Sequence, residues 1–355
     1  MQRQSMVGAA LGVVLLLVAG AALPEETASS TFDDGAVYQI AYPVWFKQSF
    51  LSLPDDAEMA AEAGKQGLFL FFTTQGCSYC HLFIEKVLGD PELSARLRGH
   101  FDSIGLEIFS DAELTDFAGE ETRVKTFALD QGVEFAPTLL FVDTDGTPLL
   151  RLTGYYGPDR FGRVLDYLTT GAGAGRSWPE YLAAVRDDGN GDADTRADAT
   201  TPAQPLRADP LFAEPPYVLD RSRFAGERPL LVLFEDDDCA PCEQYHQQVL
   251  ADGAIRERLG GFDVVRLDAA DAHTPVLTPA GKQTSPADWY QSLGFTQLPA
   301  LAFFNEDGEN VQATDALVLQ SRMNNLIGFV IDRAYERGWN YQRYARSQAL
   351  EKASD

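Results

Sequence analysis

Two pairs of cysteines, each pair separated by two residues, are the groups in this 355-residue chain best suited to chemistry: Cys77 with Cys80, and Cys239 with Cys242. An apolar run precedes each pair, so each is predicted to follow a buried strand and to begin a helix. Unpaired backbone N–H groups and the positive end of the helix dipole favour a thiolate at that place. The second cysteine lies one turn further on the same face and can attack a mixed disulfide on the first. Each pair can therefore carry out reversible two-electron chemistry.

The sequence around the first pair recurs around the second pair, at the offset that separates Cys77 from Cys239. The same offset relates further landmarks: Pro137 to Pro299, Gly132 to Gly294, Phe141 to Phe303, and Asp145-Gly146 to Asp307-Gly308. The spacing from the first cysteine to the proline is therefore identical in the two halves. Self-similarity at a fixed offset predicts one architecture that has been duplicated.

Each half is predicted to run strand, helix, strand, helix, strand, strand, helix. The continuous apolar run at 68–72 is typical of a central strand covered on both faces. In the first half, further strands are expected at 101–109, 139–142 and 149–152, with helices after the cysteines, at 122–130 and at 159–169. In the second half, strands are expected at 230–235, 262–268, 301–305 and 310–314, with helices through 250, from 285 and at 322–337. Asp-Gly pairs between the last two strands of each half predict hairpin turns.

Composition and charge exclude several classes of protein. Hydrophobic residues make up 45% and charged residues 23% of the chain, which is typical of globular domains rather than of disorder. The formal net charge of −25 repels nucleic-acid phosphates and anionic lipid headgroups. We therefore expect that the protein has no nucleic-acid partner and no basic surface for docking on a membrane.

The first residues are predicted to be a targeting segment. Residues 1–22 contain Arg3, an apolar run from Met6 to Val18, and small residues that end in an A-x-A cleavage pattern. We expect a cleaved signal peptide, hence no membrane span in the mature chain and a periplasmic or secreted location. Cysteines oxidise in such compartments unless another protein keeps them reduced.

The remaining chain is predicted to divide into two domains with short connecting segments. The first domain is expected at 37–175 and the second at 215–338. An acidic flexible linker is expected at 187–209, because that segment lacks apolar periodicity, and a C-terminal tail at 339–355.

With strand, motif, helix and distant proline in this order, both halves resemble the thioredoxin family. The resemblance implies an α/β fold of two tandem thioredoxin-like domains, each a central mixed β-sheet flanked by helices. It implies that Cys77 is the nucleophile and Cys80 the resolving thiol. It implies the same two roles for Cys239 and Cys242. In that family the proline is cis and lies against the cysteines, and Pro137 and Pro299 occupy the matching positions.

The first half also resembles the periplasmic thioredoxin-related proteins found with sulfur-oxidation systems. That resemblance rests on residues 45–51, Trp-Phe-Lys-Gln-Ser-Phe-Leu, and 151–155, Arg-Leu-Thr-Gly-Tyr.

Both halves also depart from the ordinary thioredoxin pattern. Phe71 and Leu233 stand where the family has a buried aspartate, so we expect that proton acceptor to be missing. Cys239 follows four acidic residues, 235–238, which predicts a higher thiol pKa than that of Cys77. His81, next to Cys80, is either a modulator of the site or a solvated helix residue, and His246 is expected to be a packed core histidine.

The sequence thus predicts an extracytoplasmic thiol–disulfide oxidoreductase, first of all a reductase or electron relay, that acts on proteins with thiols or disulfides. It would need no bound cofactor and no metal, but would need an upstream redox partner to recharge it. A disulfide oxidase or isomerase is the nearest alternative. Two structural disulfides, four cysteines on one zinc ion, and an adaptor that uses its thioredoxin folds only for docking are the alternatives from other classes.

Overall fold

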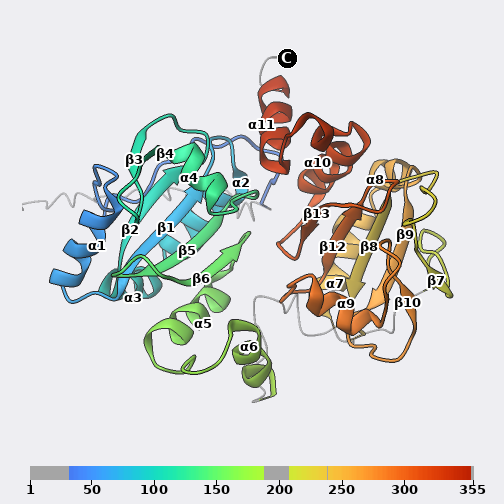
Figure 1. Cartoon of the computed structure of the whole chain (residues 1–355), viewed down its shortest axis with the longest axis horizontal. Helices are drawn as coiled ribbons and strands as arrows, with labels where there is room; N and C mark the ends of the chain where they lie inside the picture. Colours follow the sequence, from blue (N-terminus) through green and yellow to red (C-terminus); the bar gives the residue numbers. More distant parts are fainter. Residues whose placement is uncertain (1–31, 188–207, 238, 353–355) are drawn as a thin grey trace, which may run out of the picture. The chain divides into compact units, whose positions relative to one another are not determined.

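The structure, a computed structural model, describes residues 32–187, 208–237 and 239–352 (Figure 1). The predicted signal peptide at 1–22 and nearly all of the predicted linker at 187–209 lie outside the described residues. Among the residues described, no helix is both long and apolar enough to cross a membrane.

A four-stranded mixed sheet forms the centre of the first half. Its strand order is β2-β1-β5-β6, with β1 at Gly67–Thr73, β2 at Phe101–Glu107, β5 at Thr138–Asp143 and β6 at Pro148–Thr153. Strand β1 pairs in parallel with β2 and antiparallel with β5, which in turn pairs antiparallel with β6. The predicted central strand is therefore confirmed, since β1 has a neighbour on each side.

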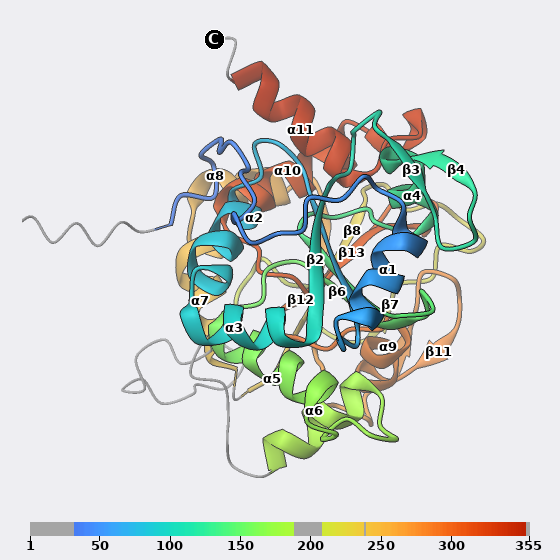
Figure 2. The ribbon, with the colours of Figure 1, turned by 90° about the vertical axis from the view of Figure 1, so that its left-hand side faces the viewer.

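Helices cover both faces of this sheet, which explains the unbroken apolar run of β1. Leu68, Leu70 and Phe72 pack in a cluster with residues of α1 (Leu53–Glu62) and α4 (Val124–Asp130). The alternate residues Phe69 and Phe71 face α5 (Pro158–Thr169) and α2 (Ser78–Phe83), through rings of Phe161 and Phe83 at 6.4 and 5.2 Å. Figure 2 shows α1 on one side of β2, with α2 and α3 (Pro91–His100) on the other.

The second half repeats this architecture. Its sheet has the order β9-β8-β12-β13, with β8 at Leu230–Glu235, β9 at Asp263–Asp268, β12 at Ala300–Phe304 and β13 at Asn310–Thr314. The helices are α7 (Ala240–Tyr245), α8 (Gly253–Leu259), α9 (Pro286–Ser292) and α10 (Gln320–Ile331). A π-helical turn follows the cysteine helix in both halves, η1 (Ile84–Leu88) and η3 (His246–Leu250). The offset that relates the two cysteine pairs thus also relates these helices, including their π turns.

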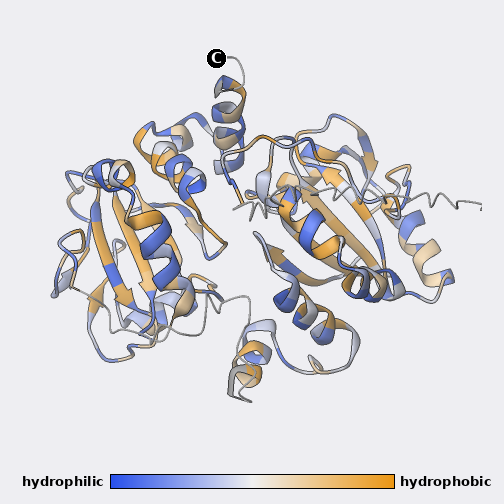
Figure 3. Cartoon of the chain, turned by 180° about the vertical axis from the view of Figure 1, so that it is seen from behind, coloured by the Kyte–Doolittle hydropathy of each residue, from blue (hydrophilic) through white to orange (hydrophobic). Residues whose placement is uncertain are grey.

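Several elements surround the duplicated core. Short strands form β3 (Glu113–Thr115) with β4 (Glu121–Arg123), and β7 (Tyr217–Val218) with β10 (Val276–Leu277) and β11 (Gln283–Thr284). Helix α6 (Trp178–Asp187) follows the first half, and η4 (Ala334–Arg337) follows α10. The segment 339–355, expected to be a tail, contains helix α11 (Tyr341–Lys352), whose Tyr341 and Tyr344 are buried in the core of the second half. Figure 3 shows the strands of both sheets as mainly hydrophobic.

Residues from Asp33 onward belong to one compact unit, and the two halves share side-chain packing. Phe135, from the first half, is 2% exposed and lies in the hydrophobic cluster of the second half. Its ring stacks on Tyr341 of α11 at 4.9 Å. The loop that carries Pro137 is therefore anchored by residues far away in sequence.

Gly67, the first residue of β1, has a backbone φ of +155°, and a Cβ there would collide with the carbonyl oxygen of Val142. We expect Gly67→Ala to lower the free energy of unfolding by about 3 kcal/mol, because it adds a steric clash to an unfavourable φ. Gly64→Ala is the matched control, since Gly64 also has a positive φ but has open space around it. It is expected to cost about 1 kcal/mol. Urea denaturation of both variants measures the difference, and equal losses would contradict this account.

Candidate redox site

The first cysteine pair lies where β1 passes into α2. Cys77 is the N-cap residue of α2, and its Sγ accepts a hydrogen bond from the backbone N–H of Cys80 at 3.1 Å. The two cysteines form a disulfide with Cα atoms 5.3 Å apart. Cys77 is 9% exposed and Cys80 is fully buried, so an attacking thiolate can approach only the sulfur of Cys77.

The loop before β5 lies beside this disulfide. The peptide bond between Ala136 and Pro137 is cis, as the family resemblance implies for this position. Ala136 and Cys77 line the same cavity, together with residues of α10 and α11. The structure thus brings the cysteines and this loop together at one site, although they are distant in the sequence.

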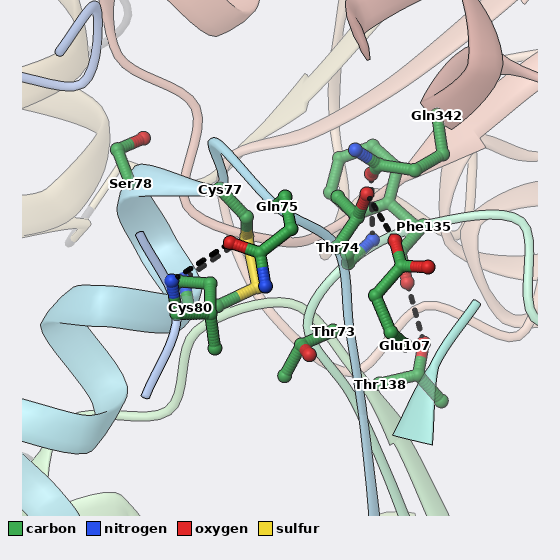
Figure 4. The surroundings of a disulfide bond; sticks show 12 residues. Thr73, Thr74, Gln75, Cys77, Ser78, Cys80, Glu107, Phe135, Thr138 and Gln342 are labelled. Carbon is green, nitrogen blue, oxygen red and sulfur yellow. Dashed lines mark hydrogen bonds between the residues drawn. A yellow bond between two sulfur atoms is a disulfide. The ribbon is translucent and has the colours of Figure 1, made fainter. Parts of the chain in front are cut away.

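A network of polar side chains surrounds the first disulfide (Figure 4). Thr74 Oγ1 donates a hydrogen bond to Glu107 Oε1 at 3.0 Å, and the backbone N–H of Phe109 donates to Glu107 Oε2 at 3.1 Å. Arg346 of α11 also donates to Glu107 Oε1, at 3.0 Å. Glu107 is therefore a carboxylate near the site that is held by donors from both halves.

Tyr79, between the two cysteines, is a buried anchor rather than an exposed loop residue. Its hydroxyl donates to Asp34 Oδ2 at 2.9 Å and accepts from the backbone N–H of Leu319 at 3.0 Å. Burial is the main cause that raises the pKa of Tyr79 well above its ordinary value, so the hydroxyl keeps the proton that it donates. The guanidinium of Arg322 lies over its ring, 3.3 Å from the centroid.

The second cysteine pair has the same local geometry. Cys239 is the N-cap of α7, its Sγ accepts from the N–H of Cys242 at 3.2 Å, and the pair is disulfide-bonded with Cα atoms 5.2 Å apart. The peptide bond between Leu298 and Pro299 is also cis. Cys239 is partly exposed, whereas Cys242 is buried.

Glu235 and His246 differ from their sequence-based interpretation. Glu235 is fully buried at the end of β8, and its carboxylate lies 2.8 Å from Nε2 of His246 and 3.8 Å from Arg266. Glu235 is therefore a charge held between two basic side chains and not one of four solvated acids beside the thiolate. The expectation that His246 is a packed core residue was wrong, because its side chain is 25% exposed and pairs with this carboxylate.

The His81 side chain contacts Tyr38 and Glu85. Its ring stacks on Tyr38 at 4.1 Å, and Nε2 lies 3.7 Å from Glu85 on the next turn. The backbone N–H of His81 donates to the carbonyl of Cys77, as expected in the first turn of the helix. Its role as a modulator stays a prediction.

Sequence reasoning located the cysteines and prolines but missed the residues contributed from a distance. Glu107, Arg322, Gln342 and Arg346 all lie at the first site. No local pattern distinguishes these residues from ordinary surface polar groups. The offset between the halves pairs Arg322 with Arg160, and this repeated arginine was an available signal.

Comparison with known proteins identifies the family. The family described as thioredoxin-like domain matches residues 53–169 and 219–331, which together make up more than half of the chain. The chain therefore belongs to the thioredoxin-like domain family and contains that domain twice. The predicted tandem thioredoxin-like fold is confirmed, whereas the outer domain limits and the relation to sulfur-oxidation proteins stay predictions.

Solved structures and curated proteins add little to this assignment. A thioredoxin-fold protein from Helicobacter pylori is 21% identical, with 40% of this chain and 88% of that chain covered and a TM-score of 0.33. A thioredoxin from Thermus thermophilus is 22% identical, with coverages of 35% and 88% and a TM-score of 0.28. A protein disulfide oxidoreductase from Aeropyrum pernix is 12% identical, with coverages of 81% and 95% and a TM-score of 0.23. No curated protein matches the chain.

The second site lies close to a group of carboxylates. The pKa of Asp268, at the end of β9, is raised above its ordinary value, mainly by burial and further by the negative charges of Asp236, Asp237 and Asp271. Asp236 and Asp237 closely precede Cys239 in the chain, and their negative charges oppose ionisation of the Cys239 thiol. We therefore expect Asp236→Asn with Asp237→Asn to lower the pKa of reduced Cys239.

The rate of iodoacetamide alkylation against pH measures this pKa, in a Cys77→Ser/Cys80→Ser background. Glu58→Gln with Glu62→Gln neutralises two exposed carboxylates of α1 in the first half and is the control for the overall change in charge. A midpoint that does not move in the Asp236/Asp237 variant, or moves equally in the control, would show that these carboxylates do not act on Cys239.

Proposed function

We propose that this protein is a thiol–disulfide oxidoreductase that works on other proteins, as a reductase or electron relay. One observation carries the proposal: both thioredoxin-like regions hold a cysteine pair at a helix N-terminus, with the first sulfur accepting an N–H bond from the second cysteine. This position favours a thiolate on the first cysteine and keeps the second within reach of it.

The proposed reaction is an exchange of two electrons. The thiolate of Cys77 attacks a client disulfide, forms a mixed disulfide and releases one client thiolate. Cys80 then loses its proton and attacks Cys77 Sγ, which releases the second client thiol and leaves the Cys77–Cys80 disulfide. An upstream redox protein returns two electrons by the reverse sequence. The same roles are proposed for Cys239 and Cys242, with Pro137 and Pro299 as supporting residues.

The direction of electron flow and the compartment belong to the same proposal. Strong disulfide oxidases stabilise their reduced form, and here no histidine stands between the cysteines to do so. Reduction of clients is therefore proposed ahead of disulfide oxidation or isomerisation. The apolar first residues favour export to the periplasm or beyond.

Reduction of insulin by dithiothreitol in the presence of the protein tests the proposed function. We expect the wild-type protein to accelerate insulin precipitation, Cys77→Ser to slow the reaction, and Cys77→Ser with Cys239→Ser to reduce it to the rate of dithiothreitol alone. Ser is the matched change, since it replaces only the sulfur atom. A wild-type protein that is no faster than dithiothreitol alone would favour the adaptor, whose cysteines stay oxidised.

A further inference from the structure

Residues of the second half occupy the backbone polar groups of Ala136, beside the first disulfide. The N–H of Ala136 donates to Oε1 of Gln342 on α11 at 2.9 Å, and its carbonyl accepts from Nη2 of Arg322 on α10 at 3.0 Å. Both contacts are buried and join residues that are far apart in the sequence. Ala136 is thus fully paired, although it lies two residues before the start of β5 and outside the sheet ladder.

Arg322 is held firmly in this position. It is 5% exposed, and its guanidinium lies over the rings of Tyr79 and Phe135, 3.3 and 4.6 Å from their centroids. Its Nη1 donates to the carbonyl of Leu317 at 2.8 Å, and its backbone N–H donates to Asp34 at 2.9 Å. Because these contacts fix the guanidinium, Arg322 acts as a rigid cover over the loop and not as a mobile surface charge.

An exposed N–H and C=O on one residue are the groups with which an extended polypeptide adds to a strand edge. At Ala136 these groups are already bonded to Gln342 and Arg322. The sulfur of Cys77 is reached through a cavity lined by α10, α11 and residues 34–37. A small thiol can enter such a space without breaking the two contacts, whereas a polypeptide must displace them to pair with Ala136.

We infer that Arg322 and Gln342 give the first site its substrate selectivity: the Cys77–Cys80 disulfide exchanges with small thiols, and polypeptide clients react only after α10 and α11 release Ala136. This inference rests on the proposed function. In the step itself, a small thiolate attacks Cys77 Sγ, forms a mixed disulfide and releases the Cys80 thiolate. A second thiolate then attacks the small-molecule sulfur of the mixed disulfide, which forms the small disulfide and releases the Cys77 thiolate. Two electrons thus enter the protein.

The two halves also contact each other away from Ala136, and these contacts help to keep α10 and α11 against the first half. Gly154 and Ala316 are related by the offset that relates the cysteine pairs, and a Cβ at Gly154 would collide with the Cβ of Ala316. Tyr156 of the first half interacts with Thr296 and Gln297, in the loop that leads to Pro299. Gly154→Ala should therefore weaken the contact between the halves. Because the N–H of Gly154 donates to the carbonyl of Pro137 at 2.8 Å, the change also loosens the loop that carries Ala136.

The test compares two substrates in a Cys239→Ser/Cys242→Ser background, so that only the first pair reacts. The pre-reduced protein is mixed with 2-hydroxyethyl disulfide or with insulin, and the two second-order rate constants are measured. Loss of one hydrogen bond raises the equilibrium constant for release of Ala136 from α10 and α11 by about 2- to 10-fold. We expect Gln342→Ala to raise the ratio of the insulin rate to the small-disulfide rate by that factor. Gly154→Ala should shift the ratio in the same direction.

Gln320→Ala is the matched control, because Gln320 is an exposed glutamine of α10 whose side chain bonds to Gln248 within the second half. It should leave the ratio unchanged. A ratio that stays at the wild-type value in both Gln342→Ala and Gly154→Ala would overturn the inference, as would equal increases of both rates. A wild-type protein that reacts with neither disulfide would instead refute the proposed function. Reaction of a variant with 2-hydroxyethyl disulfide also shows that its site is folded.

Discussion

The hydrogen bond from the backbone N–H of the second cysteine to the sulfur of the first is the interaction on which the rest of the site depends. It exists because a buried strand ends at Thr73 and a helix begins just after Cys77, so the sulfur occupies the N-cap position. The first helical N–H groups have no backbone partner there, and a sulfur that gains negative charge can bind them. The sheet and its covering helices serve to hold this junction, and the same junction recurs at Cys239.

Duplication gives the chain two such junctions, and the surroundings make them different. At the first site, side chains of the second half line the same cavity as Cys77: Arg322, Gln342 and Arg346. At the second site, Cys239 is partly exposed, and carboxylates gather around the end of β9. Two sulfur pairs with similar backbone geometry therefore differ in access and in charge, which are the properties that select partners in disulfide exchange.

Much of the fold followed from local patterns. The apolar run of β1 marked a strand buried on both faces, the repeated landmarks marked a duplication, and the proline positions matched the cis bonds. The sequence could not locate Arg322 at Tyr79, because that contact depends on how the two halves pack against each other. The acidic run also concealed Glu235, which is the last residue of a strand that is buried throughout, whereas Asp236 is partly exposed and Asp237 is exposed. Helix α11 was missed because its polar sequence packs through only a few buried residues, Tyr341, Gln342 and Tyr344.

The central claim is that the Cys77–Cys80 pair is a reversible redox centre and not a structural link. Equilibrium titration of this pair against glutathione or dithiothreitol buffers, with Cys239 and Cys242 replaced by serine, tests the claim most directly. The account predicts a reversible two-electron transition between about −300 and −240 mV, the range below the strongly oxidising proteins and above typical structural disulfides. A disulfide that stays oxidised below about −300 mV would contradict the claim, whereas a midpoint above about −150 mV would contradict only the proposed direction of electron flow.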